Sequence, residues 1–310
     1  MEVVHKLSDF HPHQKTILTI GTFDGVHVGH QKIIRNLVEQ AEKEKLLSVV
    51  LTFFPHPRQV LQKDTQLKMI DTMEEKIKLL EQWGVAVLII LPFTLAFSRM
   101  TALAFTQELL VGRLNISKII IGYDHRFGRN RKASVADLKQ FGEDYDFTVE
   151  EIPAQDIASI AVSSTKIREA IADGEIHKAN LYLNRPFSLV GTVVSGDRIG
   201  RKIGFPTANL KIEEDYKLLP KHGVYLVRSN LQGQAYFGMM NVGNRPTVSG
   251  KKTQIETHFF EFQGDLYEKS IQIDLLEKIR DEQKFDTLEA LSQQIQQDKN
   301  NCLALLPKYR

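Results

Sequence analysis

The chain has 310 residues, enough for two domains of ordinary size, and its 42% hydrophobic and 25% charged residues are typical of globular proteins. A net charge of +2 excludes a strong bulk attraction to nucleic acid or to an anionic membrane, so neither is expected as a partner. The one cysteine, Cys302, excludes an internal disulfide and a paired-cysteine metal site. The N-terminal segment lacks the apolar core of a signal peptide, and the longest apolar run, 85–91, is too short to cross a bilayer, so a cytoplasmic protein is expected.

The first half of the chain alternates short, β-branched apolar runs with helical patterns. The runs lack polar–apolar alternation, which indicates strands that are buried on both faces. Helices are predicted over 33–41, over 73–83 with Asp71 or Thr72 as the N-cap, and over 102–111. This alternation predicts a parallel sheet with helices on its faces. The predicted strands are 17–20, 49–54, 85–91, 118–121 and 147–152.

From about Asn184 the pattern changes to strand-like runs separated by Gly and Asn, which predicts an antiparallel barrel or sandwich. A domain boundary is therefore placed at 183/184. An amphipathic helix closes the chain, with Asp286 or Thr287 as its cap. The predicted strands of this half are 188–194, 224–228, 235–241, 254–262 and 270–279.

The first candidate site is the turn between the first strand and the first helix, with the sequence Gly21-Thr22-Phe23-Asp24-Gly25-Val26-His27-Val28-Gly29-His30. Parallel sheets bind ligands at this carboxyl edge, and the N-terminus of the next helix favours phosphate. Gly29 allows a close backbone approach, and His27 and His30 can donate hydrogen bonds to charge on a phosphoryl group. The alternative is a turn with solvated histidines.

The H-x-G-H pattern of this turn resembles the nucleotidyltransferase superfamily. Its extended form, T-F-D-G-V-H-x-G-H, resembles the FMN adenylyltransferase module of prokaryotic bifunctional FAD synthetases. Segments 52–57, 122–128 and 163–168 match the same module in order. One departure is His125, where the family usually has Phe, so a stacking or packing role at this position can differ.

The resemblance implies direct attack of the FMN phosphate on the α-phosphorus of ATP, with His27 and His30 stabilising the transition state. Ser164, Thr165 and Arg168 open a late helix and suit the β- and γ-phosphates, although an N-cap with exposed basic residues is the alternative. The resemblance further implies nucleotide contacts by Gly21, Phe23, Asp24 and Gly29, and flavin contacts by His56, Asp124 and Arg126. For His56, a rigid Pro-His-Pro turn is the alternative.

The second candidate site is the glycine-rich stretch 191–210, which carries three basic side chains. Its composition predicts a loop that folds over phosphates, and a glycine-rich hairpin is the alternative. Thr207 and Asn209 are hard oxygen donors that could coordinate Mg²⁺ together with ATP phosphates.

This stretch resembles the riboflavin kinase module, whose signature is G-x-x-x-G-x-x-x-G-F-P-T-A-N. Segments 223–225, 241–247, 256–258 and 284–288 match that module too. The match implies that Glu256 is the catalytic base for the ribityl hydroxyl, although an outward-facing strand glutamate is the alternative. It also implies phosphate contacts by Gly196, Gly200, Gly204 and Pro206.

The two resemblances together imply an α/β architecture: an N-terminal Rossmann-like nucleotidyltransferase domain with a parallel sheet over 1–183, and a C-terminal antiparallel β-barrel riboflavin kinase domain with a terminal helix over 184–310. They imply a bifunctional enzyme that makes FMN from riboflavin and FAD from FMN, with ATP as co-substrate, Mg²⁺ as cofactor and flavins as substrate and product. The rivals are an enzyme with one of these activities, a different nucleotidyltransferase and a flavin-binding regulator without catalysis. The oligomeric state stays open, with a weak homo-oligomer among the options.

Overall fold

The computed structural model describes residues 1–62, 66–122, 126–152, 162–196, 200, 203–247 and 250–309. They form two compact units, Met1–Ser164 and Thr165–Arg310. Helices α8 (Ser164–Asp173) and α9 (Ile176–Leu183) group with the second unit, since Asn180 Nδ2 donates to the carbonyl of Leu275, 2.9 Å away. The compact units therefore divide nearer to the N-terminus than the boundary predicted at 183/184. That boundary concerns domains that fold on their own, and it stays a prediction. No helix among the described residues combines the length and apolarity needed to span a membrane.

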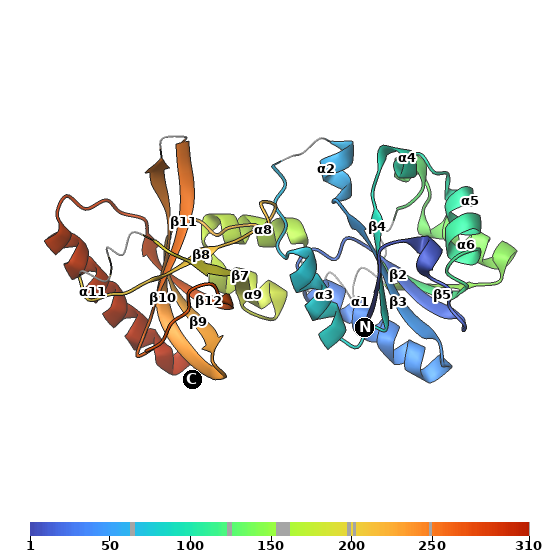
Figure 1. The fold of residues 1–310 in the computed structure, drawn as a ribbon. Coiled ribbons are helices and arrows are strands. Elements are labelled where there is room, and N and C mark those ends of the chain that lie inside the picture. Colours follow the sequence, from blue (N-terminus) through green and yellow to red (C-terminus); the bar gives the residue numbers. More distant parts are fainter. Residues whose placement is uncertain are drawn as a thin grey trace. The chain divides into compact units, whose positions relative to one another are not determined.

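The first unit contains a six-stranded, all-parallel sheet in the order β1-β4-β3-β2-β5-β6 (Figure 1). The order β4-β3-β2-β5-β6 is that of a doubly wound sheet, which confirms the predicted α/β class. All predicted strands of this half are present. The structure adds the short strand β1, which was not predicted because three residues are too few to show a sequence pattern. The strands are β1 (Glu2–Val4), β2 (Thr16–Ile20), β3 (Leu47–Phe54), β4 (Val87–Pro92), β5 (Ile116–Gly122) and β6 (Thr148–Ile152).

Successive residues of the central strands enter two different hydrophobic cores, one on each face of the sheet. Helices α1 (Val28–Glu44) and α3 (Met73–Gln82) cover one face, while α6 (Val135–Tyr145) and a π-helical segment, η2 (Phe105–Val111), cover the other (Figure 1). The predicted helix over 102–111 is thus wound as α5 (Ala102–Ala104) followed by η2. The remaining short elements are η1 (Leu7–Asp9), α2 (Pro57–Leu61), α4 (Leu95–Ser98) and η3 (Arg129–Arg131).

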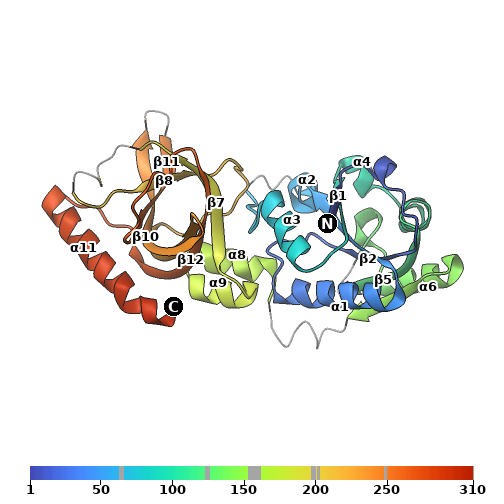
Figure 2. The same cartoon turned by 60° about the horizontal axis from the view of Figure 1, so that its bottom comes forward.

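The second unit contains a closed antiparallel barrel in the order β10-β11-β8-β7-β12-β9, which decides for the barrel over the sandwich (Figure 2). Helix α11 (Leu288–Leu305) lies along the outside of the barrel and packs on it through a core that includes the buried Cys302. Thr287 caps this helix by accepting a hydrogen bond from the Ala290 amide. The strands are β7 (Phe187–Val194), β8 (Ala208–Lys211), β9 (Gly223–Leu231), β10 (Gln234–Thr247), β11 (Gly250–Phe259) and β12 (Ser270–Asp281), and η4 (Leu306–Lys308) ends the chain.

Candidate active sites

The turn that follows β2 lies at the switch point of the sheet, because β3 and β5 flank β2 and the chain reverses its direction of winding there. Phe23 has φ 46°, Gly25 φ 85° and Val26 φ 37°, so the backbone is left-handed at three places in four residues. Phe23 and Val26 are non-glycine residues in this strained region, and both are buried. A Cβ at Gly21 would lie 3.1 Å from the Phe23 ring, closer than an ordinary contact, so the ring would have to shift.

Side chains and amides from distant segments hold this turn. The buried Asp24 accepts a hydrogen bond from the Ile70 amide through Oδ1, at 2.9 Å. The Asp24 carbonyl accepts one from Ser164 Oγ, also at 2.9 Å. The Thr22 carbonyl accepts from Lys76 Nζ at 2.8 Å and from Thr52 Oγ1 at 3.3 Å. These contacts explain how a turn of unfavourable local geometry persists.

His27 and His30 stack on each other at the entrance to α1. Their ring centroids are 3.7 Å apart at an interplanar angle of 19°, and Phe23 meets His30 edge-on at 5.1 Å. His27 is the N-cap residue of α1 but makes no capping hydrogen bond through its side chain. The Nδ1 atoms of both histidines are buried and have no hydrogen-bond partner among the described residues. A buried polar atom of this kind is costly unless a ligand satisfies it.

Burial keeps both imidazoles neutral at physiological pH. It lowers the pKa of His27 to about 4, against a smaller opposing effect of the His27 backbone. It also lowers the pKa of His30 well below its usual range, helped by the positive charges of protonated His27 and of Lys76. A neutral imidazole has one N–H donor and one acceptor nitrogen, so the pair can donate to phosphate oxygens without proton release.

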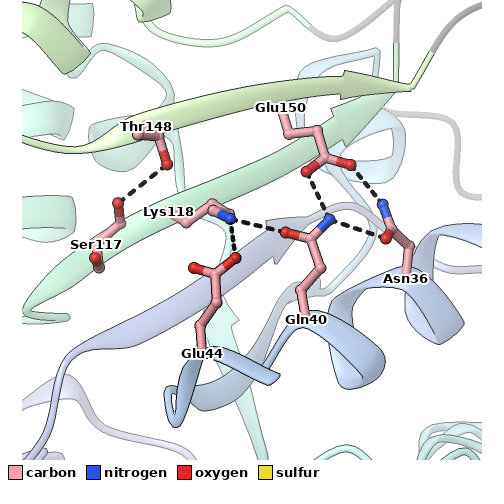
Figure 3. A network of polar contacts seen from close by, with 7 residues as sticks. All are labelled: Asn36, Gln40, Glu44, Ser117, Lys118, Thr148 and Glu150. Carbon is pink, nitrogen blue, oxygen red and sulfur yellow. Dashed lines mark hydrogen bonds and ion pairs between the residues drawn. The ribbon is translucent and has the colours of Figure 1, made fainter. Parts of the chain in front are cut away.

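A polar network fixes the other end of α1 against the sheet (Figure 3). Lys118 of β5 donates to Gln40 Oε1 at 2.9 Å and forms an ion pair with Glu44. Gln40 and Asn36 donate to the two carboxylate oxygens of Glu150 on β6, at 2.6 and 2.7 Å. Because α1 is a continuous helix, this network sets the rotation of the helix and hence the direction of the histidines at its start.

The other residues predicted for the first site have mixed outcomes. His56 is the N-cap of α2, where its Nδ1 accepts a hydrogen bond from the Arg58 amide at 3.1 Å, so the structure gives it a capping role. Arg126 is exposed. Thr165 is exposed and Arg168 partly buried in the first turns of α8, in the second compact unit. Asp124 lies outside the described residues, as does His125.

The second site is a row of polar residues across three barrel strands. Glu256 of β11 pairs in register with Asn241 of β10 on one side and with Asn209 of β8 on the other. Residues that pair directly project from the same face of a sheet. Gln254, two residues before Glu256, donates through Nε2 to Asn209 Oδ1 and to Glu256 Oε1, both at 2.9 Å. The predicted base and one predicted metal ligand are therefore joined by a single side chain.

Buried and partly buried side chains alternate along β11. Ile255 and Thr257 are buried, while Glu256 is only partly so and stays reachable from solvent. On the same face as Glu256, His258 Nδ1 lies 2.9 Å from the Pro206 carbonyl, and its ring meets Phe205 edge-on at 5.4 Å. This contact ties the segment that carries Thr207 and Asn209 to the strand that carries Glu256.

Two glycines of the loop are required by close packing. A Cβ at Gly196 would lie 2.6 Å from Asn209 Cγ, and one at Gly200 would collide with the Phe205 carbonyl. At Gly204 the reason for glycine is the backbone conformation and not close packing, since its φ is 84°. Residues 197–199 and 201–202, the basic part of the loop, lie outside the described residues.

Sequence reasoning missed Lys76 and Gln254 and gave no role to His258. Lys76 sits in an ordinary helical pattern, and only its burial distinguishes it from the exposed Lys78. For Gln254 a signal existed, since it lies two residues before Glu256 and so on the same strand face.

Comparisons with known proteins agree with this architecture. The family model described as FAD synthetase matches residues 9–166, and the one described as riboflavin kinase matches 183–306. Relatives named bifunctional riboflavin kinase/FMN adenylyltransferase include a Bacillus subtilis protein, 34% identical over 97% of this chain and 98% of the relative. The Escherichia coli K12 protein of the same name is 36% identical over 96% of this chain and 94% of the relative.

A crystal structure described as a macrolide-efflux protein from Streptococcus pneumoniae has a TM-score of 0.87 and 33% identity, and the match covers 96% of this chain and 97% of that one. The efflux description applies to that protein, and its likeness to this chain concerns the fold.

The matches to both family models define an ATP-dependent transferase with two modules, in which the histidine turn and the glutamate row are the candidate sites. The chain belongs to the family of bifunctional riboflavin kinases/FMN adenylyltransferases. It phosphorylates riboflavin to FMN with ATP and then transfers AMP from ATP to FMN, giving FAD and pyrophosphate. The matches to both modules set aside the single-activity, other-nucleotidyltransferase and regulator alternatives.

Proposed function

We propose that the two reactions take place at two separate centres, adenylyl transfer at His27 and His30 and phosphoryl transfer at Glu256. The observation that carries this division is that His27 and His30 lie in the compact unit Met1–Ser164 and Glu256 in the unit Thr165–Arg310.

In adenylyl transfer, the FMN phosphate attacks the α-phosphorus of ATP, and pyrophosphate leaves. His27 and His30, neutral and stacked, donate hydrogen bonds to the oxygens on which negative charge develops. Their buried Nδ1 atoms, which lack a partner among the described residues, and the N-terminal end of α1 support this role. Ser164, Thr165 and Arg168 are proposed to hold the leaving phosphates. Gly21, Phe23, Asp24 and Gly29 shape the nucleotide end of the site.

In phosphoryl transfer, the terminal ribityl hydroxyl of riboflavin attacks the γ-phosphorus of ATP. Glu256 accepts the hydroxyl proton as the new P–O bond forms, and ADP leaves. Gln254 keeps the carboxylate beside Asn209 by donating to both. The glycines at 196, 200 and 204, with Pro206, are proposed to lie against the phosphates.

The kinase centre fits Mg²⁺. The hydroxyl of Thr207, just before β8, and the amide oxygen of Asn209 on β8 are hard oxygen donors, the chemistry that Mg²⁺ prefers. Among the described residues, no three His, Cys, Asp or Glu side chains cluster as a metal site, which is compatible with an ion completed by phosphate oxygens and water. Bound there, Mg²⁺ would neutralise charge on the phosphates of ATP.

The flavin contacts of the first centre are proposals that rest on the family resemblance. They involve Asp124, Arg126 and His56, of which His56 also caps a helix. Riboflavin, FMN, FAD and ATP are the proposed ligands, without a nucleic acid or membrane partner. A cytoplasmic location and the oligomeric state remain predictions.

Two variants test the division of labour. Glu256→Gln should slow FMN formation from riboflavin by about 10²–10³-fold or more while FMN-to-FAD conversion stays at the wild-type rate. His30→Ala should do the reverse and let FMN accumulate. Both variants are assayed with riboflavin, FMN, ATP and Mg²⁺ by chromatographic separation of the flavins. Equal loss of both reactions in either variant, with the fold intact, would show that the assignment is wrong.

A further inference from the structure

Lys76, on α3, is a lysine in an unusual environment. It is 3% exposed, whereas lysines almost always keep the ammonium group in water. It lies on the first unit's buried helix face, and Lys78, two residues on, is 62% exposed in its side chain and pairs with Glu74. A buried ammonium group is costly to maintain, so its position calls for a specific reason.

The ammonium group of Lys76 contacts the histidine turn. Nζ donates to the Thr22 carbonyl at 2.8 Å. The same carbonyl accepts from Thr52 Oγ1 at a longer 3.3 Å, so Lys76 provides the shorter of the two tethers. Lys76 therefore joins α3 directly to the residue before the strained Phe23.

The charges around Lys76 come from three elements. Burial lowers the pKa of Lys76, and the charges of Asp24, in the turn, and of Asp71, before α3, oppose this with a smaller effect. On α1, the positive charge of Lys76 lowers the pKa of His30, in addition to the larger effects of burial and of His27. Lys76 and the histidine pair are thus electrostatically coupled as well as joined through the turn.

We propose that Lys76 is a positioning residue for adenylyl transfer: it anchors the turn that carries the two histidines and places a buried positive charge behind them. This inference rests on the proposed role of His27 and His30. The charge has a direct use, since two anions, the FMN phosphate and the α-phosphate of ATP, must meet at this site. In a buried environment a positive charge attracts them more strongly than it would in water.

Lys76→Met tests the proposal, because methionine has similar length and no charge. Its matched control is Lys78→Met on the same helix. We expect Lys76→Met to lower kcat for FMN-to-FAD conversion by about ten- to a hundredfold, because the histidines lose their fixed geometry. Riboflavin phosphorylation by the same protein should be unchanged and serves as an internal control of folding. Lys78→Met should leave both reactions unchanged.

A pH profile separates positioning from a structural role. Without the neighbouring charge, the pKa of His30 rises, so the acid limb of the FMN-to-FAD rate should move to higher pH. Lys76→Gln, which can still donate to the Thr22 carbonyl, should recover part of kcat but keep the shifted acid limb.

The proposal is overturned if Lys76→Met keeps the wild-type kcat and acid limb, or if it impairs both reactions equally. His30→Ala is measured alongside. If that variant still makes FAD at the wild-type rate, the assignment of the centre itself is wrong, whatever the Lys76 variants do.

Discussion

The two proposed centres of this enzyme are built in opposite ways. The histidine turn consists of buried residues in strained conformations, held by Ile70, Lys76 and Ser164 from distant parts of the chain. The glutamate row needs no strained backbone, because β-sheet register alone places Asn209 beside Glu256. The first centre is therefore sensitive to changes far away in the sequence, whereas the second is sensitive to changes in its own strands and loop.

The largest effect is expected from crowding the barrel loop. In Gly196→Val the new side chain would overlap Asn209, so Asn209 must leave the row. Riboflavin phosphorylation should fall by about a hundredfold or more, with FMN-to-FAD conversion intact. Gly233→Ala is the control, because its φ of 84° brings strain while a Cβ there meets nothing within 4 Å. If Gly196→Val phosphorylates riboflavin like the control, the loop does not need to approach Asn209 for catalysis.

A smaller effect is expected from loosening the row without crowding it. Gln254→Leu removes the amide that donates to both Asn209 and Glu256. FMN formation should slow by about tenfold, the cost of two hydrogen bonds that orient rather than react. Steady-state kinetics against riboflavin and against ATP should locate the loss in kcat. An unchanged kcat would mean that register alone orients the glutamate.

The acid stability of the first unit tests the burial of the histidines. The pKa of His27 is about 4 in the folded chain and 6.5 when exposed, so the unfolded chain takes up a proton first as the pH falls. The free energy of unfolding should therefore drop between pH 6.5 and 4, by about 3 kcal/mol from His27 in total. Urea unfolding can be followed by Trp83, the one tryptophan, which lies in the first unit. His27→Gln should flatten this dependence, and an unaltered slope would contradict the assigned pKa.

The smallest expected effect concerns the helix that supplies Lys76. Thr72 caps α3 and forms a reciprocal capping box with Glu75. Thr72→Ala should cost about 1 kcal/mol of stability in the first unit, again seen by Trp83 fluorescence. The riboflavin kinase rate should not change. A loss of kinase activity in this variant would mean that the two units do not work independently.

The sequence predicted the larger part of this fold. The strands of buried β-branched residues can be predicted from their composition. The start of α3 at Asp71 or Thr72 can be predicted because a helix cap depends only on neighbouring residues. The short strands β1 and β8 were missed, since three or four residues carry too little pattern. Whether the strands form a barrel or a sandwich depends on pairing between strands that are distant in the sequence. The periodicity of the sequence does not show which strands pair.

The candidate sites were predicted only as far as motifs reach. His27, His30 and Glu256 belong to recognisable sequence motifs, but no motif predicts the contacts that position them. Lys76 looks like a surface lysine in sequence, and His56 looks like a ligand contact although its Nδ1 caps a helix. Such roles are set by which segments meet in space, which a single sequence does not reveal.

The central claim is that each centre performs its own reaction without the other. Its most direct test is an equimolar mixture of His30→Ala and Glu256→Gln proteins supplied with riboflavin, ATP and Mg²⁺. Neither variant alone should form appreciable FAD, since one stops at FMN and the other makes little FMN. The mixture should produce FAD, because FMN released by the first is adenylylated by the second. Loss of both half-reactions in either protein, when each is assayed with its own substrate, would contradict the account.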